Sequence, residues 1–347
     1  MIEQRISAGV YIVTSGIFVP GYAPCSRIWR FDKKGIELVS ESAGVSAIHS
    51  HNGSIYASDE SRGISILIPN PEAPKECLVA LVDRRLKPFG AVTPNVVDFC
   101  SYNEELFDLR YTGHRAREDT PVSKPGYQIV NTLQDARGEP PLAEITAVGL
   151  RIQGKLLNYR DSLYFVYLNE PRWSNFFDVH KDPKFENPLR PQSVGYIVSA
   201  ACASDDLAYH VELLHNAKNG FRYGIFNTLF DPKSERPLAL RQNVTALNLH
   251  NRVLYDARER YSRRKEENVG EIFVSLEDLE AQNPIAQRSS PIRFLFSHDG
   301  RLYDAGDYGV GDTLEDKVLH VFNDYPGDDL GYGRHGQRIT AIISHEK

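Results

Sequence analysis

One short pattern recurs along the chain at intervals of 46 to 52 residues. Each copy has a few apolar residues, a tight polar turn, and then a leucine or isoleucine followed by an aromatic residue. The clearest copies are 45–56, 244–256 and 292–304. The turns are centred at His51, Tyr102, Ile152, Ser204, His250, His298 and His345. A period in this range is typical of solenoids, propellers and arrays, so the chain should fold as a series of similar units.

The composition of each unit favours strands over helices. In the sixth unit, strand-like runs cover 244–249, 252–257 and 271–276, with a weaker fourth run before Pro291. Only 275–282 has a short helical pattern. Four-stranded units repeated roughly four to eight times are typical of a β-propeller. We therefore expect an all-β fold, a seven-bladed β-propeller of four-stranded blades.

The two ends of the chain supply different parts of one unit. The last copy begins at Ile339 and stops at Lys347 after one strand and its turn, whereas 10–39 supplies outer strands without an inner one. Pairing the C-terminal strand with the N-terminal strands would close the ring and remove free sheet edges. The expected blades, within a single domain spanning 1–347, are 339–347 with 1–42, 43–90, 91–144, 145–192, 193–242, 243–290 and 291–338.

The expected innermost strands do not alternate apolar with polar residues. Those beginning at Ile145, Val244 and Ile339 read Ile/Val-Thr-Ala followed by an apolar residue. A strand that is buried on both faces has no reason to alternate. A longer duplication, of 127–143 and 223–239, leads into two of these strands and indicates duplication of whole blades.

In architecture the chain resembles the seven-bladed propellers of the WD-repeat and related classes. The turns at 50–53 (Ser-His-Asn-Gly) and 297–300 (Ser-His-Asp-Gly) are similar to the Ser-Pro-Asp-Gly turn of such repeats. The Trp-Asp signature itself is absent, because neither Trp29 nor Trp173 precedes an aspartate. The resemblance therefore implies the fold and no particular functional residue.

Charge and hydropathy exclude several functions. A net charge of −6 and a pI near 6.0 argue against nucleic-acid binding and against binding to an acidic membrane. No apolar run approaches the roughly 20 residues needed to cross a membrane. The first six residues lack the features of a signal peptide, so we expect a cytoplasmic protein.

The cysteines give no metal-binding or redox signature. None of the four occurs in a CxxC spacing, so no structural zinc site is expected, and the sequence indicates no cofactor. Two of them fall in expected inner strands, where burial as a small apolar residue is the simplest interpretation. The four are Cys25, Cys77, Cys100 and Cys202.

Two sets of polar residues recur at fixed positions. His51, His250, His298 and His345 share the turn position of consecutive blades, where four imidazoles could converge on a metal ion or simply start a turn. Asp108, Asp256 and Asp304, with Asn158 in the fourth unit, follow the aromatic residue of the second strand. We expect these to cap the following loop, since catalytic carboxylates usually occupy unlike environments.

The loops between the second and third strands differ most among the units. Variable loops on a rigid scaffold commonly carry function. We expect the loop 258–265 to be exposed and its arginines to tolerate charge reversal. The candidate ligand- or partner-binding residues from these loops are His114, Arg115, Arg258, Arg260, Arg263, Arg264 and Asp304.

Two classes of function remain open at this stage. One is a non-enzymatic scaffold for protein interaction or ligand binding, with protein partners. The alternative is a hydrolase or lyase that acts on a small polar or sugar-like ligand at the axial mouth of the propeller. The sequence contains no Gly-rich phosphate loop, GxSxG or HExxH motif, and does not by itself decide whether the protein is an enzyme.

Overall fold

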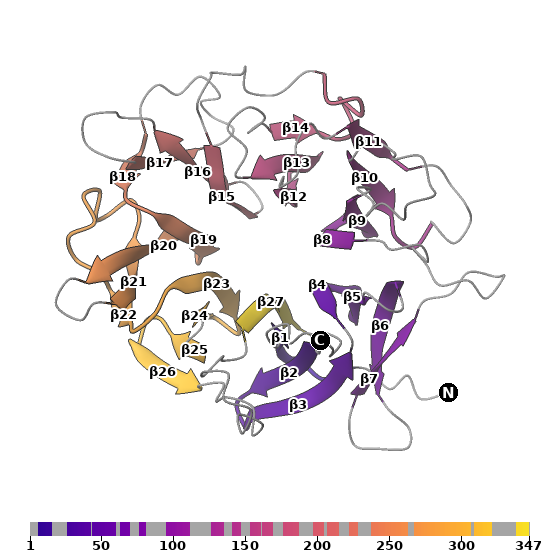
Figure 1. The fold of residues 1–347 in the computed structure, drawn as a ribbon, viewed down its shortest axis with the longest axis horizontal. Coiled ribbons are helices and arrows are strands. Elements are labelled where there is room, and N and C mark those ends of the chain that lie inside the picture. Colours follow the sequence, from indigo (N-terminus) through magenta and orange to yellow (C-terminus); the bar gives the residue numbers. More distant parts are fainter. Residues whose placement is uncertain are drawn as a thin grey trace, which may run out of the picture.

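A computed structural model of the chain shows a ring of seven small antiparallel sheets around a common axis (Figure 1). The sequence prediction of a seven-bladed β-propeller is thus confirmed. The structure describes residues 6–15, 26–42, 44–59, 63–69, 76–80, 95–111, 126–134, 141–146, 153–160, 162–168, 176–186, 197–204, 207–214, 222–227, 237–262, 267–306, 309–320 and 338–346.

The strands follow chain order from the axis outward in every blade except the first. Blade 1 contains β27 (Arg338–His345), β1 (Gly9–Ser15), β2 (Ser26–Asp32) and β3 (Gly35–Ser42). Blade 2 contains β4 (Val45–His51), β5 (Ser54–Asp59), β6 (Gly63–Pro69) and β7 (Glu76–Ala80). Blade 3 contains β8 (Asn95–Tyr102), β9 (Glu105–Tyr111), β10 (Gly126–Asn131) and β11 (Ala143–Thr146). The described part of blade 4 contains β12 (Gln153–Tyr159), β13 (Ser162–Leu168) and β14 (Phe176–Asp178).

The remaining three blades have four strands each. Blade 5 contains β15 (Ile197–Ser204), β16 (Leu207–Leu214), β17 (Arg222–Asn227) and β18 (Ala239–Arg241). Blade 6 contains β19 (Val244–His250), β20 (Val253–Ser262), β21 (Glu267–Val274) and β22 (Ala286–Arg288). Blade 7 contains β23 (Ile292–His298), β24 (Arg301–Gly306), β25 (Gly309–Asp312) and β26 (Lys317–His320).

The ring closes through the two ends of the chain, as the sequence predicted. Strand β27 pairs antiparallel with β1, from Gly9 opposite His345 to Ser15 opposite Arg338. The C-terminal strand therefore supplies the inner strand of a blade whose other strands come from the N-terminal segment (Figure 1). We call the contact between blades 7 and 1 the seam.

The fourth blade begins later than the sequence suggested. Ile145 lies in β11, which is the outer strand of blade 3, and the inner strand of blade 4 is β12. The predicted boundary at 144/145 and the inner strand at Ile145 are therefore wrong. The turn of this blade follows Tyr159 rather than Ile152, which lies outside the described residues. The predicted helix at 275–282 forms only turns after β21.

The hydrophobic core is divided among the contacts between blades. One apolar cluster lies between each pair of neighbouring blades. The aromatic residue of the repeat, at the third position of each second strand, enters the cluster shared with the following blade. These residues are Tyr11, Tyr56, Phe107, Tyr164, Tyr209, Tyr255 and Tyr303. The apolar residue before each aromatic points to the opposite face, because side chains alternate along a strand.

The inner strands share a further irregularity. Their register shifts by one residue near the start, for example between Val45 and Ala47 and between Val96 and Asp98. Comparable shifts occur in blades 5, 6 and 7. A bulge bends a strand and increases its twist locally. The recurrence in blades 2, 3, 5, 6 and 7 indicates that these inner strands bend near the same point along their length.

Deleting residues 339–347 should abolish cooperative folding. The deletion removes the inner strand of blade 1, including the buried Ile339, and leaves β1 with a free edge. Thermal unfolding monitored by circular dichroism measures the effect, with deletion of Glu346 and Lys347 alone as the matched control. An unchanged melting temperature in the longer deletion would contradict closure of the ring by β27.

Candidate functional site

The recurring aspartates lie in buried ion pairs between or within blades. Asp304 in β24 is 0% exposed, and both of its carboxylate oxygens accept hydrogen bonds from Arg288 at 2.7 Å. Arg288 belongs to β22 of the preceding blade. Thr313 also donates its hydroxyl to Asp304, at 2.9 Å. The candidate binding residue Asp304 is therefore part of the contact between blades 6 and 7.

The other two aspartates are also paired with arginines, one across a blade contact and one within a strand. Arg241 of β18 donates to Asp256 at 2.8 Å across the contact between blades 5 and 6, and both side chains are 0% exposed. In blade 3, Asp108 accepts bonds from Arg110 and, at 2.9 Å, from the hydroxyl of Thr132. These carboxylates accept hydrogen bonds from arginines and hydroxyls, so they contribute to more than the capping of a loop that the sequence suggested. Asn158 is not their equivalent, because it lies in the inner strand β12.

The four turn histidines also join neighbouring blades. Each shares a hydrogen bond between its Nδ1 and the hydroxyl of the serine just before the turn of the following blade. The pairs are His250 with Ser297 (3.1 Å), His298 with Ser344 (2.8 Å), His345 with Ser50 (2.8 Å) and His51 with Ser101 (2.9 Å).

Burial lowers the pKa of all four imidazoles, which favours their neutral form. Among the described residues, no group of three or more histidine, cysteine or acidic side chains could hold a metal ion. The histidines suggested as metal ligands therefore act, in this structure, as links from blade to blade. These links could have been predicted from the sequence, because in each case the following blade has a serine just before its turn position.

Much of the predicted basic loop 258–265 belongs to strand β20. Strands β20 and β21 pair as far as Ser262 and Glu267. Arg258 is only 14% exposed: it pairs with Glu271 at 2.6 Å and lies 4.5 Å from the centre of the Phe273 ring. Arg260, 57% exposed, reaches the same glutamate at 2.9 Å. The expectation that this segment is fully solvated is wrong for Arg258.

The remaining candidates from the loops cannot be placed. His114, Arg115, Arg263 and Arg264 lie outside the described residues. Cys100 and Cys202 do lie in inner strands and are buried, as predicted, and burial raises the pKa of both thiols to about 12. They are therefore thiols rather than reactive thiolates at neutral pH. Cys25 and the side chain of Cys77 lie outside the described part.

One ionisable pair near the axis was not found from the sequence. Asp98 in β8 accepts a backbone hydrogen bond from Leu156 of blade 4 at 2.8 Å, and another from Phe99 at 3.0 Å. Lys155 of β12 donates to the carbonyl of Ala201 in blade 5 at 3.1 Å. Burial raises the pKa of Asp98 to about 6, although Lys155 and the two amides act in the opposite direction.

A large cavity spans the seam on the face that carries the inner turns. It has a volume of about 1100 Å³, and we call it the seam cavity. Phe31, Tyr303 and Leu319 form its apolar part, and the rings of Phe31 and Tyr303 meet edge to face at 6.0 Å. Its charged rim consists of Asp32, Lys33, Lys34, Asp299, Arg301 and Glu346.

The charges on this rim are only partly neutralised. Lys33 of blade 1 forms an exposed ion pair with Asp299 of blade 7 at 2.8 Å, which lowers the pKa of the Asp299 carboxyl. Arg301 is held by Asp312 at 3.2 Å. Lys34 and Glu346 form no ion pair with any described residue. Asp32 also forms no such pair, so within the described residues the rim carries one cation and two anions without an ion pair around an apolar centre.

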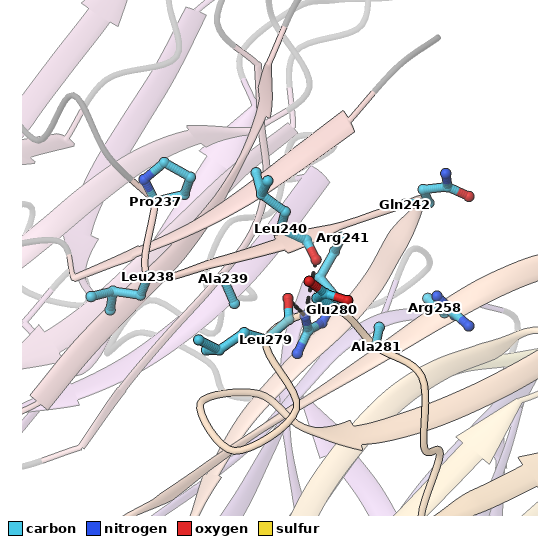
Figure 2. Close-up of a pocket in the computed structure, with 10 residues that line it drawn as sticks. All are labelled: Pro237, Leu238, Ala239, Leu240, Arg241, Gln242, Arg258, Leu279, Glu280 and Ala281. Carbon is cyan, nitrogen blue, oxygen red and sulfur yellow. Dashed lines mark hydrogen bonds between the residues drawn. The ribbon is translucent and has the colours of Figure 1, made fainter. Parts of the chain in front are cut away.

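A second cavity lies on the outer side of the contact between blades 5 and 6 (Figure 2). It has a volume of about 660 Å³, and we call it the rim groove. One wall is the run 237–242, which includes β18, and the other is the turn 279–281 of blade 6 together with Arg258. At its base, the Arg241 guanidinium donates to the carbonyl oxygens of Leu240 and Leu279, both at 2.9 Å.

Comparison with known proteins supports the fold and nothing narrower. No family model and no curated protein matches the sequence. Similar solved structures include two proteins assigned provisionally as 6-phosphogluconolactonases. The one from Bacteroides uniformis is 14% identical, with a TM-score of 0.51 over 98% of each chain. The one from Bacteroides fragilis is 11% identical, with a TM-score of 0.51 over 96% of this chain and 98% of the other.

Another similar structure is Sqt1 from Chaetomium thermophilum, at 9% identity and a TM-score of 0.48 over 94% of this chain and 82% of that one. At these identities the likeness concerns the fold alone. The protein is a seven-bladed β-propeller, and no narrower family is defined. No described helix has the length and apolar character needed to span a bilayer.

Replacing Arg258 should destabilise the protein more than replacing its neighbour. Arg258→Ala removes a mostly buried cation that pairs with Glu271 and packs on Phe273, so we expect a loss of roughly 2 kcal/mol in the free energy of unfolding. Arg260→Ala, the control in the same strand, should change it by about 0–1 kcal/mol because Arg260 is largely exposed. Denaturant titration measures both, and equal effects would show that Arg258 is not packed as described.

Asp98 should make the stability depend on pH in a defined direction. Its pKa is raised from 3.8 to about 6 in the folded protein, so the folded state binds the proton more tightly than the unfolded state. The contribution of this group is therefore greatest below pH 4 and declines as the pH rises from about 4 to 6. The free energy of unfolding of the wild type and of Asp98→Asn is measured from pH 3.5 to 7.5. The value for the wild type minus that for the variant should decrease as the pH rises from about 4 to 6. A constant difference would contradict the raised pKa.

Proposed function

We propose that this propeller is a protein-interaction scaffold whose main docking surface is the seam cavity. The observation that carries the proposal is the combination of an apolar centre with a charged rim across two rigid blades. Protein interfaces have this arrangement, with a desolvated apolar core surrounded by polar groups. Tyrosine and arginine, both present here as Tyr303 and Arg301, are enriched among the residues that contribute most to binding.

The rim charges define the chemistry of the partner. An apolar side chain of the partner would lie against Phe31, Tyr303 and Leu319. An acidic residue of the partner would meet Lys34, and a basic residue would meet Glu346. The partner segment is therefore expected to carry an apolar anchor together with charges of both signs.

The described ionisable groups support a scaffold over a hydrolase or lyase. The aspartates and turn histidines that recur in the sequence are engaged in bonds between or within blades. Asp98 is the group that favours the alternative, since a carboxyl group with a pKa near 6 could serve as a general acid. Turnover of a small lactone or sugar ester by the purified protein, lost in Asp98→Asn, would support the enzyme instead.

The scaffold proposal is tested by a photo-crosslinking amino acid at position 34, with position 184 in blade 4 as the control. We expect capture of a partner at 34 but not at 184. Lys34→Glu should weaken the reconstituted complex by about tenfold in calorimetry, whereas Lys184→Glu should leave it unchanged. Equal affinities for both variants, or no capture specific to position 34, would contradict docking at the seam cavity.

A further inference from the structure

The rim groove exposes three leucine side chains. Leu238, Leu240 and Leu279 are 43%, 42% and 50% exposed, respectively, and all three line the groove. Contiguous exposed apolar surface on a folded protein commonly marks an interaction site. In Figure 2 Leu238 and Leu240 lie along one wall, and Leu279 lies on the other side of Ala239.

The repeats provide an internal comparison for Leu240. Ala143, Ala239 and Ala286 occupy the same position in the outer strands of blades 3, 5 and 6, opposite Ile129, Ile225 and Ile272, respectively. The next residue is the exposed Glu144 in blade 3 and the exposed Gln287 in blade 6, but Leu240 in blade 5. The fold thus accepts a polar residue at this position, and stability does not require the exposed leucine.

The charges of the groove are unequal between its two walls. Arg241 is neutralised by Asp256, and Arg258 is neutralised by Glu271. Glu280 and the neighbouring Glu277 are exposed, whereas Asp278 caps the backbone amides of Gln282 and Asn283 at 3.0 and 2.7 Å. The accessible charge on the blade 6 wall is therefore negative, facing an apolar wall on blade 5.

The apolar wall is also a sheet edge. β18 is the outermost strand of blade 5, and within the described residues it pairs only with β17. An exposed edge strand is a template for an added strand. An extended segment along β18 would place alternate side chains toward the leucines, and side chains near the turn 279–281 would meet Glu280.

We propose that the rim groove binds an extended segment of a partner protein in which apolar residues alternate with lysine or arginine. The segment lies along β18, packs its apolar side chains against Leu238, Leu240 and Leu279, and places a basic side chain beside Glu280. This proposal rests on the function of an interaction scaffold, but it concerns a surface separate from the seam cavity.

The test uses a fluorescein-labelled peptide in which valine alternates with lysine, and its valine–glutamate counterpart. Fluorescence anisotropy on the full chain should show saturable binding of the lysine peptide and much weaker binding of the glutamate peptide. Leu238→Gln with Leu240→Gln should weaken binding by about tenfold or more, since burial of these leucines is lost. Glu280→Lys should reverse the preference between the two peptides.

Matched controls separate the groove from other causes. Leu314→Gln replaces an equally exposed leucine of blade 7, outside the groove, and should leave binding unchanged. Lys34→Glu should also leave it unchanged, so loss of the seam function and loss of the groove function are distinguishable. Unfolding curves establish that each variant is folded, as the natural glutamine at position 287 leads us to expect.

Three outcomes would overturn the proposal. The first is the absence of peptide binding to the wild-type protein. The second is undiminished binding to the double leucine variant. The third is a wild-type dimer in sedimentation that becomes monomeric in the same variant, which would make a second copy of this chain the occupant.

Discussion

The structure depends on the packing of each blade face against the next. A four-stranded blade cannot bury both of its faces alone, so every blade is stable only as a member of a closed ring. The apolar clusters lie between blades, and most contain the second-strand aromatic of one blade and the apolar residue before the aromatic of the next. Closure of the ring by β27 therefore covers the last two exposed faces at once.

Buried ion pairs also determine how neighbouring blades are oriented relative to each other. Arg241 and Arg288 extend from the outer strands of blades 5 and 6 to aspartates of the following blades. Removing one partner of such a pair leaves an uncompensated buried charge, which costs about 3–5 kcal/mol. The bidentate Arg288–Asp304 pair also tolerates little rotation, so it fixes the angle between blades 6 and 7 as well as their contact. The rim groove lies beside the first of these contacts, between blades 5 and 6.

The fold could be predicted because the repeated residues are the ones that pack between neighbouring blades. An aromatic after an apolar residue marks the two faces of the second strand, and it recurs in all seven blades. The fourth inner strand was missed because Ile145-Thr-Ala has the same composition as the inner strands at Val244 and Ile339. Buried strands have similar compositions at the axis and at the rim, so composition alone cannot distinguish them. The true inner strand β12 lacks this signature, with Lys155 in place of alanine.

The site was less predictable, because it depends on contacts between units. Asp304 looked accessible in the sequence since nothing near it in the chain reveals Arg288. Arg258 looked like a loop residue because the hairpin β20–β21 extends beyond the usual strand length. Both cavities join residues of neighbouring blades, so neither can be found from a single stretch of the sequence.

The histidine–serine links have a consequence for how the ring is held closed. They join blade 6 to 7, 7 to 1, 1 to 2 and 2 to 3, so they run continuously across the place where the two ends of the chain meet. The equivalent positions between blades 3 and 4, 4 and 5, and 5 and 6 have no histidine–serine pair. The residues there are Tyr102 and Asn158, Tyr159 and Ala203, and Ser204 and Leu249, respectively. The covalently interrupted side of the ring is thus the side with the additional polar links. The link from His345 of β27 to Ser50 of blade 2 therefore joins the C-terminal strand to the N-terminal half of the ring, in addition to its pairing with β1.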